Sequence, residues 1–163
     1  MKLNPEHIEE VLKLINQGPY FRLLNIDILS LEKGRCIVEA DIERKHMNCF
    51  GGMHGGESIM DTAAYWALYA EMPEDAGFIT LDQNANLTRA VQEGTHVHCE
   101  GRVVKRGGSI CICEAEMTDE KGRLLGLSTS KIFVAPSLQP ISAAIDALDP
   151  THKLPPKFLE ESC

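Results

Sequence analysis

The chain has 163 residues, of which 44% are hydrophobic and 25% are charged, and its formal net charge is −8 at pH 7. The length predicts a single domain (residues 1–163) with a full hydrophobic core, and the composition excludes a largely disordered chain. The acidic balance argues against a nucleic-acid-binding protein, since phosphate recognition depends on Lys and Arg. The sequence contains no apolar run of the roughly 20 residues that a membrane span requires, and its N-terminus has no apolar signal-peptide region. We therefore expect a cytoplasmic protein without nucleic-acid or membrane partners.

Six cysteines raise the question of disulfide bonds. Cys111 and Cys113 alternate along a predicted strand and therefore point to the same face, as buried free cysteines often do. Without a secretory signal, we expect these thiols to be reduced and structural. The remaining cysteines are Cys36, Cys49, Cys99 and Cys163.

The first part of the chain predicts a helix followed by a hairpin. Residues 5–17 carry one apolar stripe at helical spacing, and Asn4 is a good N-cap for this helix. Strands are predicted over 25–32 and 35–43. In the second of these strands apolar and polar residues alternate, so one face should be buried and the other solvated.

A Gly-rich loop over residues 44–56 leads into a predicted helix from Glu57 to Met72, which is rich in alanine. Residues 136–163 are expected to form a surface tail with a short helix at 141–147. Turn residues separate four further predicted strands, at 78–89, 95–106, 109–119 and 123–134. This order predicts an α+β fold, with one sheet of about six strands packed on one face by a single long central helix. Such a sheet leaves surface that commonly pairs with a second subunit, so we expect a homodimer.

The loop and the start of the helix hold the densest group of chemically useful residues. Gly55 and Gly56 expose backbone N–H groups where the helix begins, at the positive end of its dipole. Such a site can polarise a carbonyl group or stabilise an oxyanion, with Asn48 and His54 as orienting groups. The alternative is a tight loop in which the glycines only permit unusual backbone dihedrals.

Two carboxylates follow on the helix. Glu57 and Asp61 are four residues apart and share a helical face, so either could act as a general base or a nucleophile. Glu57 could equally do no more than complement the helix dipole in the first turn. Asp61 lies within an apolar series, where a carboxylate needs a partner or a chemical role.

The predicted strand at 78–89 carries polar side chains at every second position. Thr80, Asp82 and Asn84 should fall on one side, either as a solvated face or as a polar wall beside the site, with Thr80 positioning water or substrate. Lys105 and Arg106 form part of a basic patch that could contact phosphates, although exposed strand-end charge is the alternative.

Metal binding is not expected. His46, Cys49 and His54 lie near one another in the sequence, but their spacing fits no zinc template. We expect neither a metal nor another cofactor.

These motifs together resemble the PaaI-like branch of the hotdog-fold acyl-CoA thioesterases. The resemblance covers about residues 19–135 and depends on an Asn-x5-His-Gly-Gly run (48–56), an Asp-Thr-Ala run (61–63) and a Thr-Leu-Asp-Gln-Asn strand (80–84). It implies the hotdog fold, a curved antiparallel sheet wrapped around one central helix. It also implies a homodimer, often paired into a homotetramer, with coenzyme A lying across the interface without a metal.

The resemblance implies a role for each matching residue. The Gly55 N–H would polarise the thioester carbonyl, Asn48 and His54 would shape the loop, and the helix carboxylate would drive hydrolysis. Thr80 matches a hydroxyl position that holds water in relatives. Further contacts to the substrate or coenzyme A are expected from Gly56, Asp82, Asn84, Lys105, Arg106 and Gly107.

The carboxylate departs from the family spacing. The family places it nine residues after the His of His-Gly-Gly, which is Ala63 here, whereas Asp61 lies seven residues after His54. Two residues turn a helix by about 200°, so a carboxylate shifted by two positions on an unchanged helix would point away from the site. The match at residues 61–63 suggests instead a two-residue deletion before Asp61 and a helix that starts later. Glu57 is the alternative carboxylate.

The sequence therefore predicts an enzyme that hydrolyses an acyl- or aryl-CoA thioester to the free acid and coenzyme A. One alternative is a non-catalytic acyl-CoA-binding protein of the same fold, which the shifted carboxylate would favour. A hotdog dehydratase or hydratase is a weaker alternative, because the loop does not resemble the site that such chemistry needs.

Overall fold

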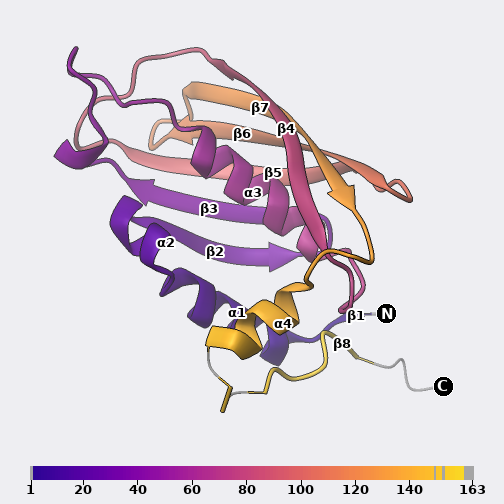
Figure 1. Cartoon of the computed structure of the whole chain (residues 1–163). Helices are drawn as coiled ribbons and strands as arrows, with labels where there is room; N and C mark the ends of the chain where they lie inside the picture. The colour runs from indigo at the N-terminus through magenta and orange to yellow at the C-terminus, as the bar shows by residue number, and fades with distance from the viewer. Residues whose placement is uncertain (1, 149, 152, 160–163) are drawn as a thin grey trace.

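The computed structural model describes residues 2–148, 150–151 and 153–159 (Figure 1). Six strands form one antiparallel sheet in the order β2-β3-β5-β6-β7-β4, and two short strands, β1 and β8, pair with each other. The elements are β1 (Lys2–Leu3), α1 (Pro5–Asn16), α2 (Pro19–Leu24), β2 (Ile26–Glu32), β3 (Arg35–Asp41), a 3₁₀ turn (Arg44–His46), α3 (Glu57–Tyr69), β4 (Phe78–Leu87), β5 (His96–Lys105), β6 (Ile110–Asp119), β7 (Leu124–Val134), α4 (Ile141–Leu148) and β8 (Phe158–Leu159).

Helix α3 lies against the concave face of the curved sheet and packs mainly on β3, β5 and β6 (Figure 1). Ala63, Ala64 and Ala67 on this helix are fully buried. A Cβ at Gly101 on β5 would overlap the carbonyl group of Ala63, so the helix backbone lies directly on the strand there. The structure confirms the predicted α+β class, with six antiparallel strands around one central helix.

The predicted elements are present, with differences of a few residues at their ends. The Asn4 side chain accepts a hydrogen bond from the Glu6 N–H at 3.1 Å, which confirms the N-cap of α1. Helix α3 ends at Tyr69 rather than Met72. We predicted no helix for Pro19–Leu24, which forms α2. Six residues are too few for a helical period to be recognised.

Strand β4 contains a β-bulge that changes which side chains face the helix. Thr80 pairs with Ile132 but Asp82 pairs with Lys131, so Leu81 is an extra residue in the ladder. One extra residue reverses the faces of all the side chains that follow. Thr80 therefore lies on the inner face with buried Ile132, and Asp82 lies on the outer face with exposed Lys131. The expectation that the polar side chains of this strand share one side is wrong.

The two ends of the described chain lie together (Figure 1). Strand β1 pairs with β8, with Leu3 opposite Phe158. The Asn4 side-chain amide donates a hydrogen bond to the Pro156 carbonyl at 2.8 Å, and the Asn4 N–H donates to the Lys157 carbonyl at 2.9 Å.

The expected surface tail (136–163) includes deeply buried residues. Ile145 and Lys157 are each 1% exposed. The Lys157 Nζ donates hydrogen bonds to the carbonyl of Tyr69 and, at 2.7 Å, to that of Met72. These carbonyls lie at the C-terminal end of α3, where unpaired acceptors need donors. Ile145 and Lys157 are therefore packed into the fold, whereas most of the described residues around them are exposed or partly exposed.

The cysteines of the sheet are buried. Cys111 and Cys113 both lie on the inner face of β6, as predicted, and Cys36 and Cys99 are also buried free thiols. Cys49 is free and exposed, and Cys163 lies outside the described residues. Among the helices that the structure describes, none is long and apolar enough to cross a membrane.

Candidate functional site

The loop before α3 is organised by one amide side chain. The Asn48 Oδ1 accepts hydrogen bonds from the N–H groups of Phe50 at 2.9 Å and Gly52 at 3.2 Å. The Asn48 N–H in turn donates to the Gly52 carbonyl at 2.7 Å. Asn48 thus fixes the turn that returns the chain toward the helix, and its amide points into the loop.

The loop delivers Gly55 and Gly56 to the start of α3. Their φ angles are +69° and +132°, which side chains rarely adopt, so glycine is needed at both positions. Gly56 is the N-cap and provides no side-chain acceptor for the first turn. Within the residues that the structure describes, none accepts a hydrogen bond from the Gly55 or Gly56 N–H. These donors are available at the positive end of the helix.

Asp61 lies in the second turn of α3 and is half-buried. The Thr80 hydroxyl donates a hydrogen bond to Asp61 Oδ1 at 2.9 Å. Burial raises the pKa of Asp61, and the smaller effect of the Thr80 hydrogen bond lowers it. The sequence predicted that a carboxylate in this apolar series needs a partner or a chemical role, and the structure places Thr80 as a hydrogen-bond partner.

The Asp61 side chain lines a hollow of about 360 Å³ between α3 and α2. The Tyr20 hydroxyl donates to Ser58 Oγ at 2.6 Å across this hollow. The lining is largely aromatic and consists of Tyr20, Phe21, Ser58, Asp61, Thr62, Tyr65 and Trp66.

The structure shows how the two candidate positions for a helix carboxylate, Asp61 and Ala63, differ in their surroundings. Helix α3 begins at Glu57, directly after Gly56, and so does not start later as the deletion interpretation expected. Ala63, at the spacing where the family has its carboxylate, is fully buried where the helix backbone meets Gly101. A carboxylate at Ala63 would be buried in the core, whereas Asp61 faces Thr80 and the hollow.

Glu57 and His54 are both exposed. The Glu57 carboxylate lies over Gly55, where it would overlap an added Cβ. The His54 N–H donates to the His46 carbonyl at 2.8 Å, but the His54 ring has no hydrogen-bond partner among the described residues. The ring that fixes this region is that of His46, which is buried and bonded through Nε2 to the Leu24 carbonyl at 2.9 Å.

Because of the bulge at Leu81, the structure brings a different polar residue to the site than the sequence predicted. Gln83 lies on the inner face of β4, and its Nε2 donates to the Glu57 carbonyl at 3.2 Å and to Ser128 Oγ at 3.3 Å. Asp82 forms an ion pair with Lys131 at 2.8 Å on the outer face. No signal in the alternating sequence distinguished Gln83, since simple alternation points its side chain away from the helix.

Asn84 and the basic turn are not brought to Asp61. Asn84 is exposed on the outer face of β4, opposite Thr129. Lys105, Arg106 and Gly107 lie at the turn between β5 and β6, beyond the C-terminal end of α3 and far from its start at Gly56 (Figure 1).

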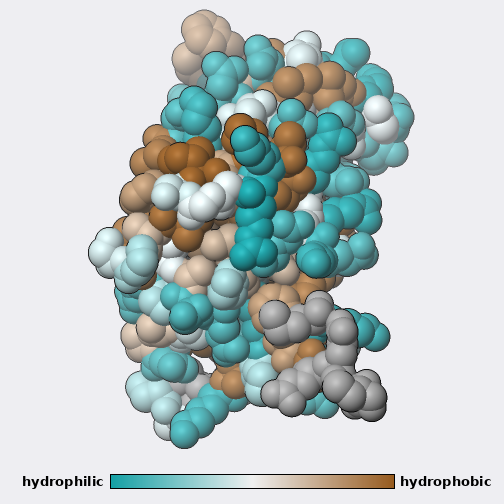
Figure 2. All heavy atoms as spheres, turned by 90° about the vertical axis from the view of Figure 1, so that its right-hand side faces the viewer, coloured by the Kyte–Doolittle hydropathy of each residue, from teal (hydrophilic) through white to brown (hydrophobic). Residues whose placement is uncertain are grey.

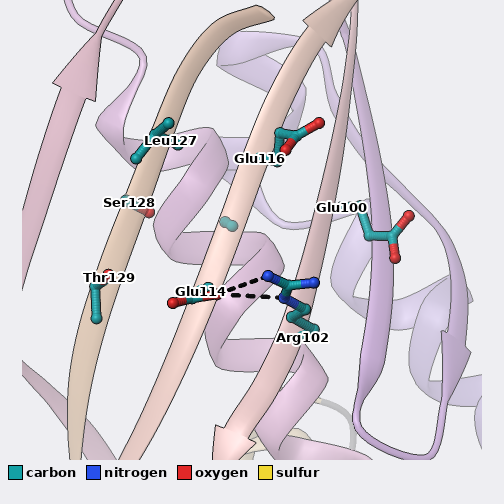
Figure 3. Close-up of a pocket in the computed structure, with 8 residues that line it drawn as sticks. Glu100, Arg102, Glu114, Glu116, Leu127, Ser128 and Thr129 are labelled. Atoms are coloured by element: carbon teal, nitrogen blue, oxygen red, sulfur yellow. Dashed lines mark hydrogen bonds and ion pairs between the residues drawn. The ribbon is translucent and has the colours of Figure 1, made fainter.

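The outer face of the sheet holds a separate hollow of about 410 Å³. Figure 3 shows its charged side chains on neighbouring strands, with the Arg102 guanidinium directed at Glu114 at 2.8 Å. Glu100 is paired with Arg35 at 2.8 Å. These residues lie across the sheet from α3, so this hollow is not part of the Asp61 site. Within the described residues, no three His, Cys, Asp or Glu side chains are grouped so that they could hold a metal ion.

Comparison with known proteins relates this geometry to a family. The family model described as the thioesterase superfamily matches residues 50–125. The 1,4-dihydroxy-2-naphthoyl-CoA hydrolase of Listeria monocytogenes is 32% identical over 114 residues, covering 68% of this chain and 91% of the relative. Acyl-coenzyme A thioesterase 13 of Homo sapiens is 24% identical over 125 residues, covering 74% of this chain and 89% of the relative. Both relatives are thioester hydrolases by name.

Solved structures share the fold. The E. coli PaaI protein from the phenylacetic acid degradation operon superposes with a TM-score of 0.73 at 18% identity, covering 82% of this chain and 96% of the other. This likeness concerns the fold, and it agrees with the hotdog architecture that the sequence motifs implied.

Proposed function

Because the chain belongs to the thioesterase superfamily, we propose that it hydrolyses an acyl- or aryl-CoA thioester to the free acid and coenzyme A. The observation that carries the proposal is Asp61, a half-buried carboxylate bonded to Thr80 near the uncapped N-terminus of α3. Desolvation raises its pKa, which brings a carboxylate toward the basicity that general-base catalysis needs near neutral pH. Relatives that act on CoA thioesters support this class of substrate.

In the proposed reaction Asp61 takes a proton from a water molecule, whose oxygen attacks the thioester carbonyl carbon. The carbonyl electron pair moves to oxygen, and the Gly55 N–H and the helix dipole stabilise the oxyanion. When the intermediate collapses, the C–S bond breaks and the coenzyme A sulfur receives the proton held by Asp61. Direct attack by the Asp61 carboxylate, through an anhydride that water then hydrolyses, is the alternative route.

The loop residues support this chemistry indirectly. Asn48 holds the turn, and Gly56 provides the second free N–H at the helix start. The exposed His54 ring would orient the thioester when substrate is bound. Glu57 is the competing carboxylate, but it is exposed and lies over Gly55. We assign the base to Asp61 because a desolvated carboxylate with a fixed partner is better suited to proton transfer.

We also propose that the protein is a homodimer joined along β4, with a homotetramer as the larger assembly. Strand β4 is an edge of the sheet, and its apolar side chains Ile79, Leu81 and Leu87 are 51%, 57% and 48% exposed. A long edge strand with exposed apolar side chains is a pairing site. Figure 2 shows that apolar residues gather in patches on the face at the right of Figure 1. A light-scattering mass of one chain would contradict this proposal.

The remaining candidate contacts depend on that assembly. Lys105, Arg106 and Gly107 lie at the opposite end of α3 from Gly55 in the same chain, so their contact with coenzyme A would have to come from a second subunit. The same holds for Asp82 and Asn84, which lie on the outer face of β4.

The test is release of free thiol from a panel of aliphatic and aromatic acyl-CoAs. Asp61→Asn should lower kcat/KM by about 10²-fold or more, the usual contribution of a general base. Glu57→Gln should retain most activity, and Asp75→Asn, at an exposed position between α3 and β4, is a matched control. Loss in Glu57→Gln alone would move the chemistry to the first turn. Binding of CoA esters without turnover of any of them would instead make this an acyl-CoA-binding protein.

A further inference from the structure

We propose that Gln83 is a positioning residue for hydrolysis, which holds the first turn of α3 so that Asp61 and the Gly55 N–H keep a fixed relation. This inference rests on the proposed thioesterase function. Gln83 reaches from β4 to the helix, where its Nε2 donates to the Glu57 carbonyl at 3.2 Å.

The carbonyl that Gln83 holds is connected to the proposed base. In an α-helix the carbonyl of one residue accepts the N–H of the residue four positions later, so the Glu57 carbonyl is the acceptor for the Asp61 N–H. A carbonyl oxygen has two lone pairs and can accept both donors. Gln83 therefore restrains the peptide group on which the backbone of Asp61 depends.

The bulge makes this contact possible. Thr80 and Gln83 are three residues apart, and in a regular strand they would point to opposite faces. The extra residue Leu81 puts both on the inner face. Thr80 then bonds to the side chain of Asp61 and Gln83 to the backbone of Glu57, one helical turn earlier.

Gln83 is itself held in place. Its Nε2 also donates to Ser128 Oγ at 3.3 Å on the neighbouring strand β7, and Ser128 is 2% exposed. The two N–H groups of one amide thus connect a buried serine of the sheet to the first turn of the helix. Because the Gln83 amide is also anchored to the sheet, it can restrain the first turn of α3 instead of moving with it.

The test compares Gln83→Met, which keeps the length but has no donor, with Gln83→Glu, which keeps the shape but cannot donate when ionised. Both should lower kcat by about 10- to 100-fold, because misplacement of reacting groups by about 1 Å can cost 10²-fold. KM should change by less than about threefold, since ground-state binding is retained. Gln17→Met, at an exposed glutamine at the end of α1, is the matched control.

A second measurement separates positioning from stability and does not require activity. Amide hydrogen exchange in the first turn of α3 should become faster in Gln83→Met, while exchange in β5 stays as in the wild type. Unchanged exchange at the helix start would overturn the proposal even if no substrate is found. Unchanged kcat, a change in KM alone, or a loss explained by the unfolded fraction would also overturn it. An inactive wild type that still shows the exchange effect would refute the thioesterase function and leave the restraint by Gln83 standing.

Discussion

The Thr80 hydroxyl lies 2.9 Å from Asp61 Oδ1 and donates a hydrogen bond to that carboxylate. The contact favours the ionised form and opposes the effect of burial, which raises the pKa of Asp61. The two residues come from elements that meet only in the folded protein, so the basicity of Asp61 depends on the position of β4. This relation leads to a prediction on the pH dependence of catalysis.

Thr80→Val should move the acid limb of the pH profile of kcat/KM to higher pH. Without the hydroxyl donor the pKa of Asp61 rises further, so the base is protonated over a wider acidic range. The profile between pH 5 and 9 measures this shift, and Thr80→Ser should retain the wild-type limb. An equal loss of rate at every pH would contradict the prediction.

Gly101→Ala should lower the free energy of unfolding by about 1–3 kcal/mol, the usual cost of overpacking a core. The added Cβ would overlap the Ala63 carbonyl, and a backbone carbonyl cannot turn aside as a flexible side chain can. Urea denaturation measures the change. Gly108→Ala is the control, because an added Cβ there meets nothing within 4 Å. Equal free energies of unfolding for the two variants would show that α3 can accommodate a Cβ at position 101 and would contradict the prediction.

Lys157→Met should remove a pH dependence of stability that the wild type shows between pH 7 and 8.5. Burial lowers the pKa of Lys157 to about 7, against 10.5 for an ordinary lysine. Below pH 7 both states hold the proton, and above pH 7 the unfolded chain holds a proton that the folded chain has lost. Stability from this group therefore rises with pH through that window.

Denaturation midpoints at pH 7 and 8.5 test this prediction, with the exposed Lys153→Met as control. The window stops at pH 8.5 because burial also raises the pKa of the core thiols, including that of Cys113 to about 12. Thiols that ionise only in the unfolded chain would reverse the slope at higher pH. Equal slopes for wild type and Lys157→Met would show that Lys157 keeps its proton in the folded state.

His96 on the outer face of β5 should titrate above the ordinary histidine value. Its ring lies between Asp41 at 2.8 Å and Glu39 at 3.2 Å, and the hydrogen bond to Asp41 is the main cause of its raised pKa. The stabilisation is complete below the unfolded pKa of 6.5 and is lost as pH rises through the folded value. NMR titration of the ring should show a lower pKa in Asp41→Asn than in the wild type. The exposed Asp75→Asn should leave it unchanged.

Much of the fold follows from local patterns in the sequence. The alternation in residues 35–43 gave the buried face of β3, and Asn4 marked the start of α1. The expectation that Asp61 needs a partner or a chemical role depended only on its apolar neighbours, and the structure places Thr80 within hydrogen-bond distance of it. Each of these features is determined within a few residues of the chain.

The features that the sequence did not predict depend on contacts between distant segments. The bulge at Leu81 arises from the pairing of β4 with β7, and no local pattern indicates it. It moved Asp82 to the outer face and brought Gln83 to the helix. The burial of Lys157 in the expected surface tail was not predicted, because its hydrogen-bond acceptors belong to the distant end of α3.

The pairing of the chain ends has a consequence for how the protein is made. Asn4 and Pro156, which share a hydrogen bond, are 152 positions apart. Ribosomes add about 5–20 residues per second, so the partner of the N-terminal segment emerges about 8–30 seconds after it. During that time the His7 ring also lacks the Pro155 carbonyl, with which it forms a 2.6 Å hydrogen bond. Helix α1 can therefore complete its docking only after Pro155 and Pro156 have been made, and until then the start of α1 lacks these contacts.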